Sequence, residues 1–392
     1  MFPERFSNLP EYAFPRLRAL LDVHAPGGDP IAMTIGEPRH DFPPWIRDVL
    51  ADTAGEFSKY PVNEGSPELR AAIADWVGRR YGVTLDADRN VMALCGTREG
   101  LYNAMMALCP ETKNGKRPKV LIPNPFYQVY MVAALSVAAE PVFLDATRET
   151  GYLPDFDAVP AAVLDETAVV YLCSPSNPQG AVATKGYWAN LIALAEKHDF
   201  KIFADECYSE IYRDAQPVGA LTVSHEVGAD PERVVLFNSL SKRSNLPGLR
   251  SGLVATGPES IARMKTLRNY AGSPLPMPLQ RVAEKVWAEE THVVENRALY
   301  QEKYALADDI LGGVPGYLGP EAGFFLWLPV EDDEAATMKL WTETGVRVLP
   351  GSYLGRDGVG VNPGKTYIRA ALVAPKNQTA EGLTALRDCL YA

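Results

Sequence analysis

Residues 233–252 read RVVLFNSLSKRSNLPGLRSG, an apolar run followed at once by a polar loop. The run 233–237 is short and rich in β-branched residues, which is typical of a buried strand. Ser239, Ser241 and Lys242 come directly after it, and Arg250 lies eight residues beyond the lysine. A lysine beside serines indicates an imine-forming amine, and serine with arginine indicates a phosphate clamp. Taken alone, the same residues would also make a solvated basic loop.

The sequence around this stretch repeats the strand pattern in alternation with helices. Similar apolar runs occur at 90–94, 119–122, 140–144, 168–172, 200–204 and 252–255. Helical patterns lie between them at 67–81, 98–108, 126–138, 184–198 and 259–270. The alternation predicts an α/β fold in which helices cover both faces of a mostly parallel sheet. Such sheets bind ligands at the carboxyl ends of their strands.

The pattern changes after residue 275. One long helix is predicted at 277–310, strands at 323–328, 346–349 and 366–372, and a last helix at 379–390. These elements predict a second, smaller α+β domain, and the proline-rich stretch AGSPLPMP at 271–278 predicts the boundary. We expect an N-terminal arm and small-domain segment at 1–35, a large domain at 36–275 and a small domain at 276–392.

Residues that could contact a ligand follow four other predicted strands. They are Gly96, Thr97, Arg98, Tyr127, Asn177, Asp205 and Tyr208. Gly96 and Thr97 open a helix, whose free amides favour an anion. Tyr127 offers a ring for stacking, and Asn177 sits in a rigid turn between prolines. Asp205 directly follows an apolar strand, so its carboxylate must be solvated, paired or functional. Taken alone, each feature is better explained as an ordinary cap, packing residue or turn.

Composition narrows the class of protein. The chain has 392 residues and a formal net charge of −11, so it lacks the basic surface that nucleic acids or anionic membranes attract. Five widely spaced cysteines form neither a disulfide framework nor a zinc site. The N-terminus carries prolines and charges in place of a signal peptide. We therefore expect a cytoplasmic protein without a metal.

Together, the strand ends carry what one flat, phosphorylated aromatic aldehyde would need, namely pyridoxal 5′-phosphate. The motifs SLSK-x7-R, DECY, SPSNPQG and YPVNEGSPELR stand at 239–250, 205–208, 174–180 and 60–70. In this order and spacing the chain resembles the fold type I pyridoxal-phosphate aminotransferases of class I/II, from about Thr34 to the C-terminus. The resemblance implies a transaminase that works by ping-pong chemistry.

The resemblance also implies a role for each residue. Lys242 would carry the cofactor and move a proton, Asp205 would keep the ring nitrogen protonated, and Tyr208 would bond the phenolic oxygen with Asn177. Tyr127 would stack on the ring. The phosphate would be held by Ser239, Ser241, Arg250 and the segment Gly96, Thr97 and Arg98, and by Tyr60 from the partner of a homodimer. The substrate carboxylate would be bound by Arg369, Asn177 and the backbone of Gly36.

The stretches FNSLSKRSNLPGLRSG (237–252) and LPGSYLGRDGVGVNPGKTYIRAALVAP (349–375) resemble the proteobacterial type of N-succinyldiaminopimelate aminotransferase, which serves lysine biosynthesis. This implies N-succinyl-LL-2,6-diaminopimelate and 2-oxoglutarate as the substrate pair. Both carry a distal carboxylate, for which Arg98 is the candidate cation. An aspartate- or alanine-type aminotransferase or a C–S lyase on the same fold are the alternatives, and an aminotransferase-like sensor domain without catalysis is a remote one.

Overall fold

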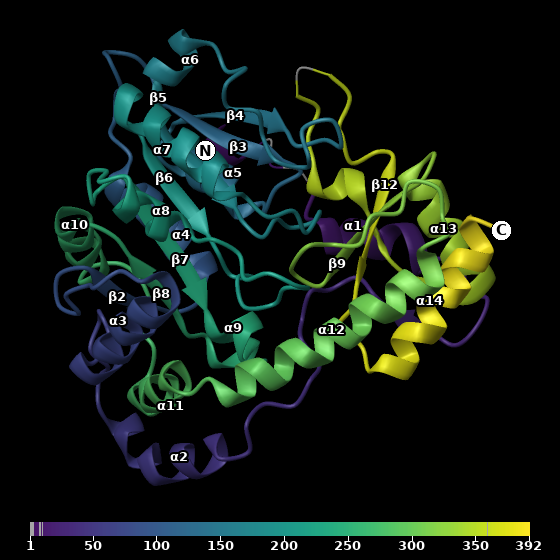
Figure 1. Ribbon diagram of the computed structural model, residues 1–392, viewed down its shortest axis with the longest axis horizontal. Coiled ribbons are helices and arrows are strands. Elements are labelled where there is room, and N and C mark those ends of the chain that lie inside the picture. Colours follow the sequence, from purple (N-terminus) through teal and green to yellow (C-terminus); the bar gives the residue numbers. More distant parts are fainter. Residues whose placement is uncertain (1–3, 8, 10, 359) are drawn as a thin grey trace.

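The computed structural model describes residues 4–7, 9, 11–358 and 360–392. Residues 1–3, 8 and 10 of the predicted N-terminal arm therefore lie outside the described residues. Figure 1 shows a large body built around one sheet, a smaller body that contains the C-terminus, and a long helix running from one to the other.

A seven-stranded sheet forms the centre of the large body. Its strands, in spatial order, are β2 (Val91–Leu94), β8 (Gly252–Ala255), β7 (Val234–Ser239), β6 (Lys201–Asp205), β5 (Thr167–Cys173), β3 (Lys119–Asn124) and β4 (Glu140–Asp145). β8 runs antiparallel to both of its neighbours, and the pairs from β7 to β4 are parallel. The predicted mostly parallel sheet is confirmed. All strands except β8 end at one edge.

Helices cover both faces of this sheet. They are α3 (Pro67–Tyr81), α4 (Thr97–Leu108), α5 (Val129–Ser136), α6 (Ala161–Asp165), α7 (Lys185–His198), α8 (Ala220–Glu226), α10 (Pro258–Arg268) and α11 (Met277–Ala288), and α2 (Ile46–Thr53) packs on α11. Alternate strand residues point to opposite faces: Tyr171 packs in the apolar cluster with α4, α5 and α10, and Leu172 in the cluster with α7 and α8. Both faces of the strands are apolar because both are buried.

Local signals set the bounds of helix α3. The Ser66 hydroxyl accepts from the Leu69 amide at 3.2 Å, and Pro67 takes the first helical position. The helix ends at Gly82, whose φ of 69° is the left-handed conformation that glycine adopts without strain. These residues explain why the predicted range 67–81 and the observed range coincide.

The smaller body combines a three-stranded antiparallel sheet with four helices. The sheet has the order β11 (Leu349–Pro350), β12 (Tyr367–Ala371) and β9 (Phe325–Pro329), and β1 (Ile31–Ala32) pairs with β10 (Val346–Arg347). The helices are α1 (Ala13–Leu21), α12 (Thr291–Leu311), α13 (Asp333–Thr344) and α14 (Lys376–Leu390). The chain before residue 35 thus contributes to the same body as its C-terminal end.

The predicted single helix at 277–310 is wrong. The chain leaves helical geometry at Glu289, where α11 has ended and α12 has not begun. The Glu289 carboxylate accepts from the amides of Thr291 and His292 and so caps the start of α12. α11 packs in the same apolar cluster as α3. We therefore propose that the large domain extends to about residue 288 rather than to 275, and the division of the chain otherwise stays a prediction. Helix α13 was not predicted.

No helix in the described part of the chain is both long and apolar enough to cross a membrane.

Candidate active site

A cavity of about 500 Å³ lies where the strand ends of the large sheet face the smaller body. Twelve of the residues singled out from the sequence line it: Gly36, Thr97, Arg98, Tyr127, Asn177, Asp205, Tyr208, Ser239, Ser241, Lys242, Arg250 and Arg369. The structure therefore brings together side chains that are up to 333 residues apart in the sequence. Gly96 lies just behind this lining, and Tyr60 lies outside it.

Lys242 follows the end of β7, on the short helix α9 (Leu240–Arg243). Its amine donates a hydrogen bond to the carbonyl of Gly36 in the N-terminal segment. Burial lowers the pKa of Lys242 to about 8, because the ammonium loses water that the neutral amine does not need. A larger share of this lysine is therefore the free, nucleophilic amine near neutral pH.

Asp205 is the last residue of β6 and its carboxylate is buried. Burial raises the pKa of Asp205, while the Tyr130 hydroxyl, which donates to Oδ2 at 2.7 Å, opposes that rise. The positive charge of Lys242 also lowers the pKa of Asp205. A carboxylate held in this way can keep a nearby ring nitrogen protonated.

The segment around Gly96 and the side chain of Arg250 form an anion cradle. Gly96 has a φ of 80° and precedes α4, and no side chain caps that helix start. A Cβ on Gly96 would lie 2.0 Å from Nη2 of Arg250, so only glycine lets this guanidinium approach. Arg250 is fixed by a 2.8 Å bond from Nη1 to the Pro247 carbonyl. Thr97, Ser239 and Ser241 add hydroxyl groups to the same wall.

Arg369 enters the cavity from β12 and is only 4% exposed. Its Nη1 donates to Oδ1 of Asn177 at 3.0 Å, and Nη2 donates to the Thr34 carbonyl at 2.8 Å. Nε has no partner among the described residues. Burial lowers the pKa of Arg369 to about 10. A buried guanidinium with unused donor capacity is suited to bind a carboxylate.

Tyr208 and Tyr127 supply aromatic walls. The Tyr208 ring meets Phe324 edge to face at 5.4 Å between centroids, and burial raises the pKa of its hydroxyl well above the usual value. The Tyr127 hydroxyl accepts from Nε of Arg98 at 2.6 Å. Arg98 is exposed at the cavity, so the second cation expected there is present and is oriented by Tyr127.

Tyr60 stands apart from this group because its side chain is fully exposed. Its predicted role needs a second subunit, so that role stays a prediction.

Sequence reasoning did not identify several residues of the site. They are Tyr12, Phe14, Glu37, Tyr130, Cys207 and Phe325. Tyr130 lies three residues after Tyr127, in the first turn of α5, and its ring contacts the Tyr127 ring edge to face at 5.7 Å between centroids. Cys207 lies between Asp205 and Tyr208, and burial raises the pKa of its thiol well above the usual value, so it is a neutral wall of the cavity. The remaining residues belong to the N-terminal segment and to the small sheet, and only the folded chain brings these segments to the cavity.

The donor set fits one kind of molecule. The cradle at Gly96 and Arg250 suits a phosphate, Asp205 suits a pyridine nitrogen, and Lys242 suits an aldehyde carbon. Arg369 is left for the carboxylate of an amino acid. Pyridoxal phosphate, when bound, supplies an aldehyde that links covalently to amines and a ring that accepts electrons. The fold and site thus define a pyridoxal-phosphate enzyme that acts on amino acids.

Comparisons with known proteins agree with this class. Residues 28–385 match the family Aminotransferase class I and II, and the chain therefore belongs to that family. Its fold closely matches a crystal structure of an aminotransferase from Neisseria meningitidis (TM-score 0.93, 37% identity, 99% of both chains). It also matches the aminotransferase AspB from Helicobacter pylori (TM-score 0.90, 31% identity, 97% of this chain and 98% of that one).

Relatives of similar length carry a more specific description. The chain is 30% identical to an LL-diaminopimelate aminotransferase of Dehalococcoides mccartyi over 98% of both proteins. It is 31% identical to an LL-diaminopimelate aminotransferase of Desulforudis audaxviator, covering 99% of this chain and 97% of that protein. The chain is a pyridoxal-phosphate-dependent transaminase that acts on amino and 2-oxo acids, and the class predicted from the sequence is confirmed.

Proposed function

We propose that this transaminase moves an amino group between N-succinyl-LL-2,6-diaminopimelate and 2-oxoglutarate, a step of lysine biosynthesis. The observation that carries the proposal is the pair of arginines in one cavity: Arg369, buried, and Arg98, exposed beside Tyr127. 2-Oxoglutarate has two separated carboxylates and the succinylated substrate has three. Arg369 would bind the α-carboxylate of either substrate, and Arg98 would bind a distal one.

Each residue of the site would have a separate role in the reaction. Arg369 and Asn177 would orient the substrate through its α-carboxylate, with the Gly36 backbone closing from the other side. Lys242 would take the proton from the substrate Cα and return it to the cofactor carbon, since its lowered pKa suits a general base near pH 8. Asp205 would hold the proton on the ring nitrogen. The smaller body and the N-terminal segment would exclude water.

LL-diaminopimelate is the second candidate donor. The relatives named for this substrate match nearly the whole chain. The cavity also contains Glu37, which would meet the distal ammonium that this substrate keeps and the succinylated one lacks. At about 30% identity the relatives do not decide between the two. An aspartate- or alanine-type aminotransferase is a further outcome of the same test.

We also propose a homodimer in which Tyr60 contacts the cofactor phosphate of the partner. The supporting observation is that this tyrosine is fully exposed, although it belongs to the conspicuous segment YPVNEGSPELR. A cytoplasmic location likewise stays a prediction from the sequence.

A half-reaction screen tests the proposal. The yellow holoenzyme is mixed with one amino acid at a time, and its aldehyde absorbance is followed as it converts to the amine form. We expect rapid conversion by N-succinyl-LL-2,6-diaminopimelate and glutamate, and slow conversion by alanine and aspartate. Faster conversion by unmodified LL-diaminopimelate would favour the second candidate, and conversion by alanine or aspartate alone would contradict both. Absence of a half-reaction with any of these amino acids would contradict all of these substrate assignments.

A further inference from the structure

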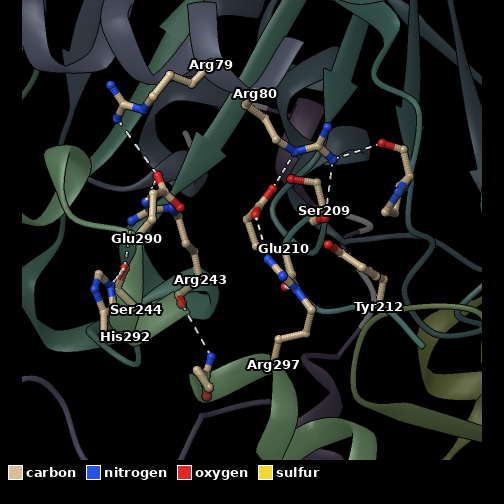
Figure 2. Close-up of polar contacts among 12 residues, drawn as sticks. Arg79, Arg80, Ser209, Glu210, Tyr212, Arg243, Ser244, Glu290, His292 and Arg297 are labelled. Carbon is tan, nitrogen blue, oxygen red and sulfur yellow. Dashed lines mark hydrogen bonds and ion pairs between the residues drawn. The ribbon is translucent and has the colours of Figure 1, made fainter. Parts of the chain in front are cut away.

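The short helix α9, which contains Lys242, is fixed by contacts on the side away from the cavity. The next residue, Arg243, is 0% exposed, and its guanidinium lies against the adjoining rings of Trp76 and Trp287, 5.5 and 5.3 Å from their centroids. Figure 2 shows Arg243 reaching Glu290, at 2.6 Å, just before helix α12 begins. Asn296 of α12 donates from Nδ2 to the carbonyls of Lys242 and Arg243, both at 3.3 Å. The position of Lys242 therefore depends on α12.

Asn296 is also the first residue in a chain of hydrogen bonds that leads to the smaller body. Because its Nδ2 faces two carbonyls, its Oδ1 is the acceptor for Nδ1 of His40, at 2.9 Å. Nε2 of His40 lies 2.7 Å from the amine of Lys303. An ammonium only donates, so Nε2 accepts and the ring proton sits on Nδ1. Lys303 also donates to the Leu372 carbonyl at 3.1 Å.

Lys303 occupies a costly position. It is 2% exposed, and within the described residues no carboxylate lies close enough to pair with it. Burial and the charge of Arg39 lower its pKa to about 8. A buried ammonium without a counter-charge destabilises a fold, and an apolar side chain of similar length is often more stable. Stability alone therefore does not explain this lysine.

We call the hydrogen-bonded residues Asn296, His40 and Lys303 the relay. The relay connects the part of the cavity that contains Lys242 to the part that contains Arg369. The segment 33–40 accepts from Arg369 at the Thr34 carbonyl and from the Lys242 amine at the Gly36 carbonyl, and it ends at His40. Leu372, the far partner of Lys303, lies three residues beyond Arg369, just past the end of strand β12. The contacts thus form a closed loop from Arg369 through Lys303, His40 and Asn296 to Lys242.

We propose that His40, Asn296 and Lys303 are positioning residues that fix Lys242 relative to Arg369. None of the three lines the cavity, so they act through the lysine turn and the segment 33–40. The inference rests on the proposed roles of Lys242 and Arg369. It predicts that the relay controls turnover rather than substrate affinity.

The test compares His40→Phe, His40→Gln and Lys303→Met in the holoenzyme. We expect His40→Phe and Lys303→Met to lower kcat about tenfold, with KM values for both substrates changed less than about twofold. Glutamine can donate to Asn296 and accept from Lys303, so His40→Gln should restore most of kcat. The denaturation midpoint of Lys303→Met should stay the same or rise, because an unpaired buried charge is removed.

A second measurement does not depend on turnover. In the full chain without cofactor, an amine-reactive label at pH 8 is quantified on Lys242 by peptide mass spectrometry. His40→Phe should raise the labelling rate about threefold, the equivalent of one weak hydrogen bond, as the amine loses the Gly36 carbonyl. The ionisable groups around that amine are Glu37, Asp205, Cys207, Arg250 and Arg369, and the variant changes none of them.

Tyr304→Phe is the matched control. This buried tyrosine lies on the same helix and donates to the Gly323 carbonyl, away from the relay. It should leave kcat and Lys242 labelling unchanged. Equal losses in Tyr304→Phe and His40→Phe, or a kcat loss in Lys303→Met that only follows a lower denaturation midpoint, would overturn the proposal. If the wild type transaminates nothing, the proposed function fails, and the labelling result still decides the relay.

Discussion

Replacing Tyr130 by phenylalanine removes the hydroxyl that donates to Asp205 at 2.7 Å and leaves the aromatic ring in place. A hydrogen bond to a charged group is worth about 1.5–3 kcal/mol, and one pKa unit is about 1.4 kcal/mol. Burial already raises the pKa of Asp205, and Tyr130 is the first of the contacts that oppose it. We therefore expect Tyr130→Phe to destabilise the Asp205 carboxylate by about 1.5–3 kcal/mol and to raise the pKa of Asp205 further.

The expected consequence for catalysis follows from the role of the acid. A less stable Asp205 carboxylate holds the ring proton less firmly, so kcat should fall about ten- to a hundredfold while KM changes little. The assay has two parts: the pH titration of the Asp205 carboxyl carbon by NMR in the cofactor-free chain, assigned with Asp205→Asn, and steady-state kinetics of the holoenzyme.

Tyr171→Phe provides the control for this experiment. Tyr171 is also fully buried, stacks on Tyr130 at 4.4 Å between centroids, and donates its hydroxyl to the Leu101 carbonyl instead of to Asp205. It should leave the titration of Asp205 unchanged. An unaltered Asp205 titration in Tyr130→Phe, or an equal shift in Tyr171→Phe, would refute the reasoning.

Three other substitutions test separate parts of the site. Arg98→Ala should raise KM for 2-oxoglutarate about fivefold and leave KM for pyruvate unchanged, and equal effects on both would remove Arg98 from the distal-carboxylate role. Arg369→Lys keeps the charge but loses the planar fork, so kcat/KM should fall about a hundredfold for every substrate, as measured with glutamate and alanine. Burial raises the pKa of Glu206 to about 7, well above its usual 4.5. The folded chain therefore binds this proton more tightly, and the free energy of unfolding should fall by about 3 kcal/mol between pH 4 and pH 8 through this group. Urea titrations of Glu206→Gln should lack that fall, and an unchanged pH dependence would contradict it.

Residues next to the ends of predicted strands could be identified from the sequence. Asp205, Ser239 and Lys242 directly follow or end apolar runs, and the parallel sheet brings those ends to one edge. Gly96 could also be identified from the sequence, but the reason that a glycine is required at this position could not. Its hydrogen is needed because the guanidinium of Arg250 lies 2.0 Å from where a Cβ would be, a contact that only the folded chain shows.

Contacts that depend on how helices cross could not be predicted. The break between α11 and α12 falls at Glu289 and Glu290, which are good helix formers, so helix propensity does not mark it. It arises because α11 packs on α3 while α12 passes to the smaller body. The course of α12 places Asn296 against the Lys242 carbonyl and Lys303 against the His40 ring. A sequence shows these as unremarkable polar residues of a helix.

The charges of the cavity set a limit on how selective this enzyme can be. The chain is acidic overall, yet the cavity is lined by four basic side chains and two acidic ones. In the proposed function, Arg250 and Arg369 have tasks that every substrate shares, since they would bind the cofactor phosphate and the α-carboxylate. Among the charged side chains described at the cavity, Arg98 and Glu37 remain to distinguish one substrate from another, and both are exposed, where an ion pair is worth about 1 kcal/mol or less. The open site should therefore favour dicarboxylates over monocarboxylates only about fivefold. A stronger preference requires closure that buries Arg98 beside Tyr127, so the degree of selectivity itself measures how far the N-terminal segment closes.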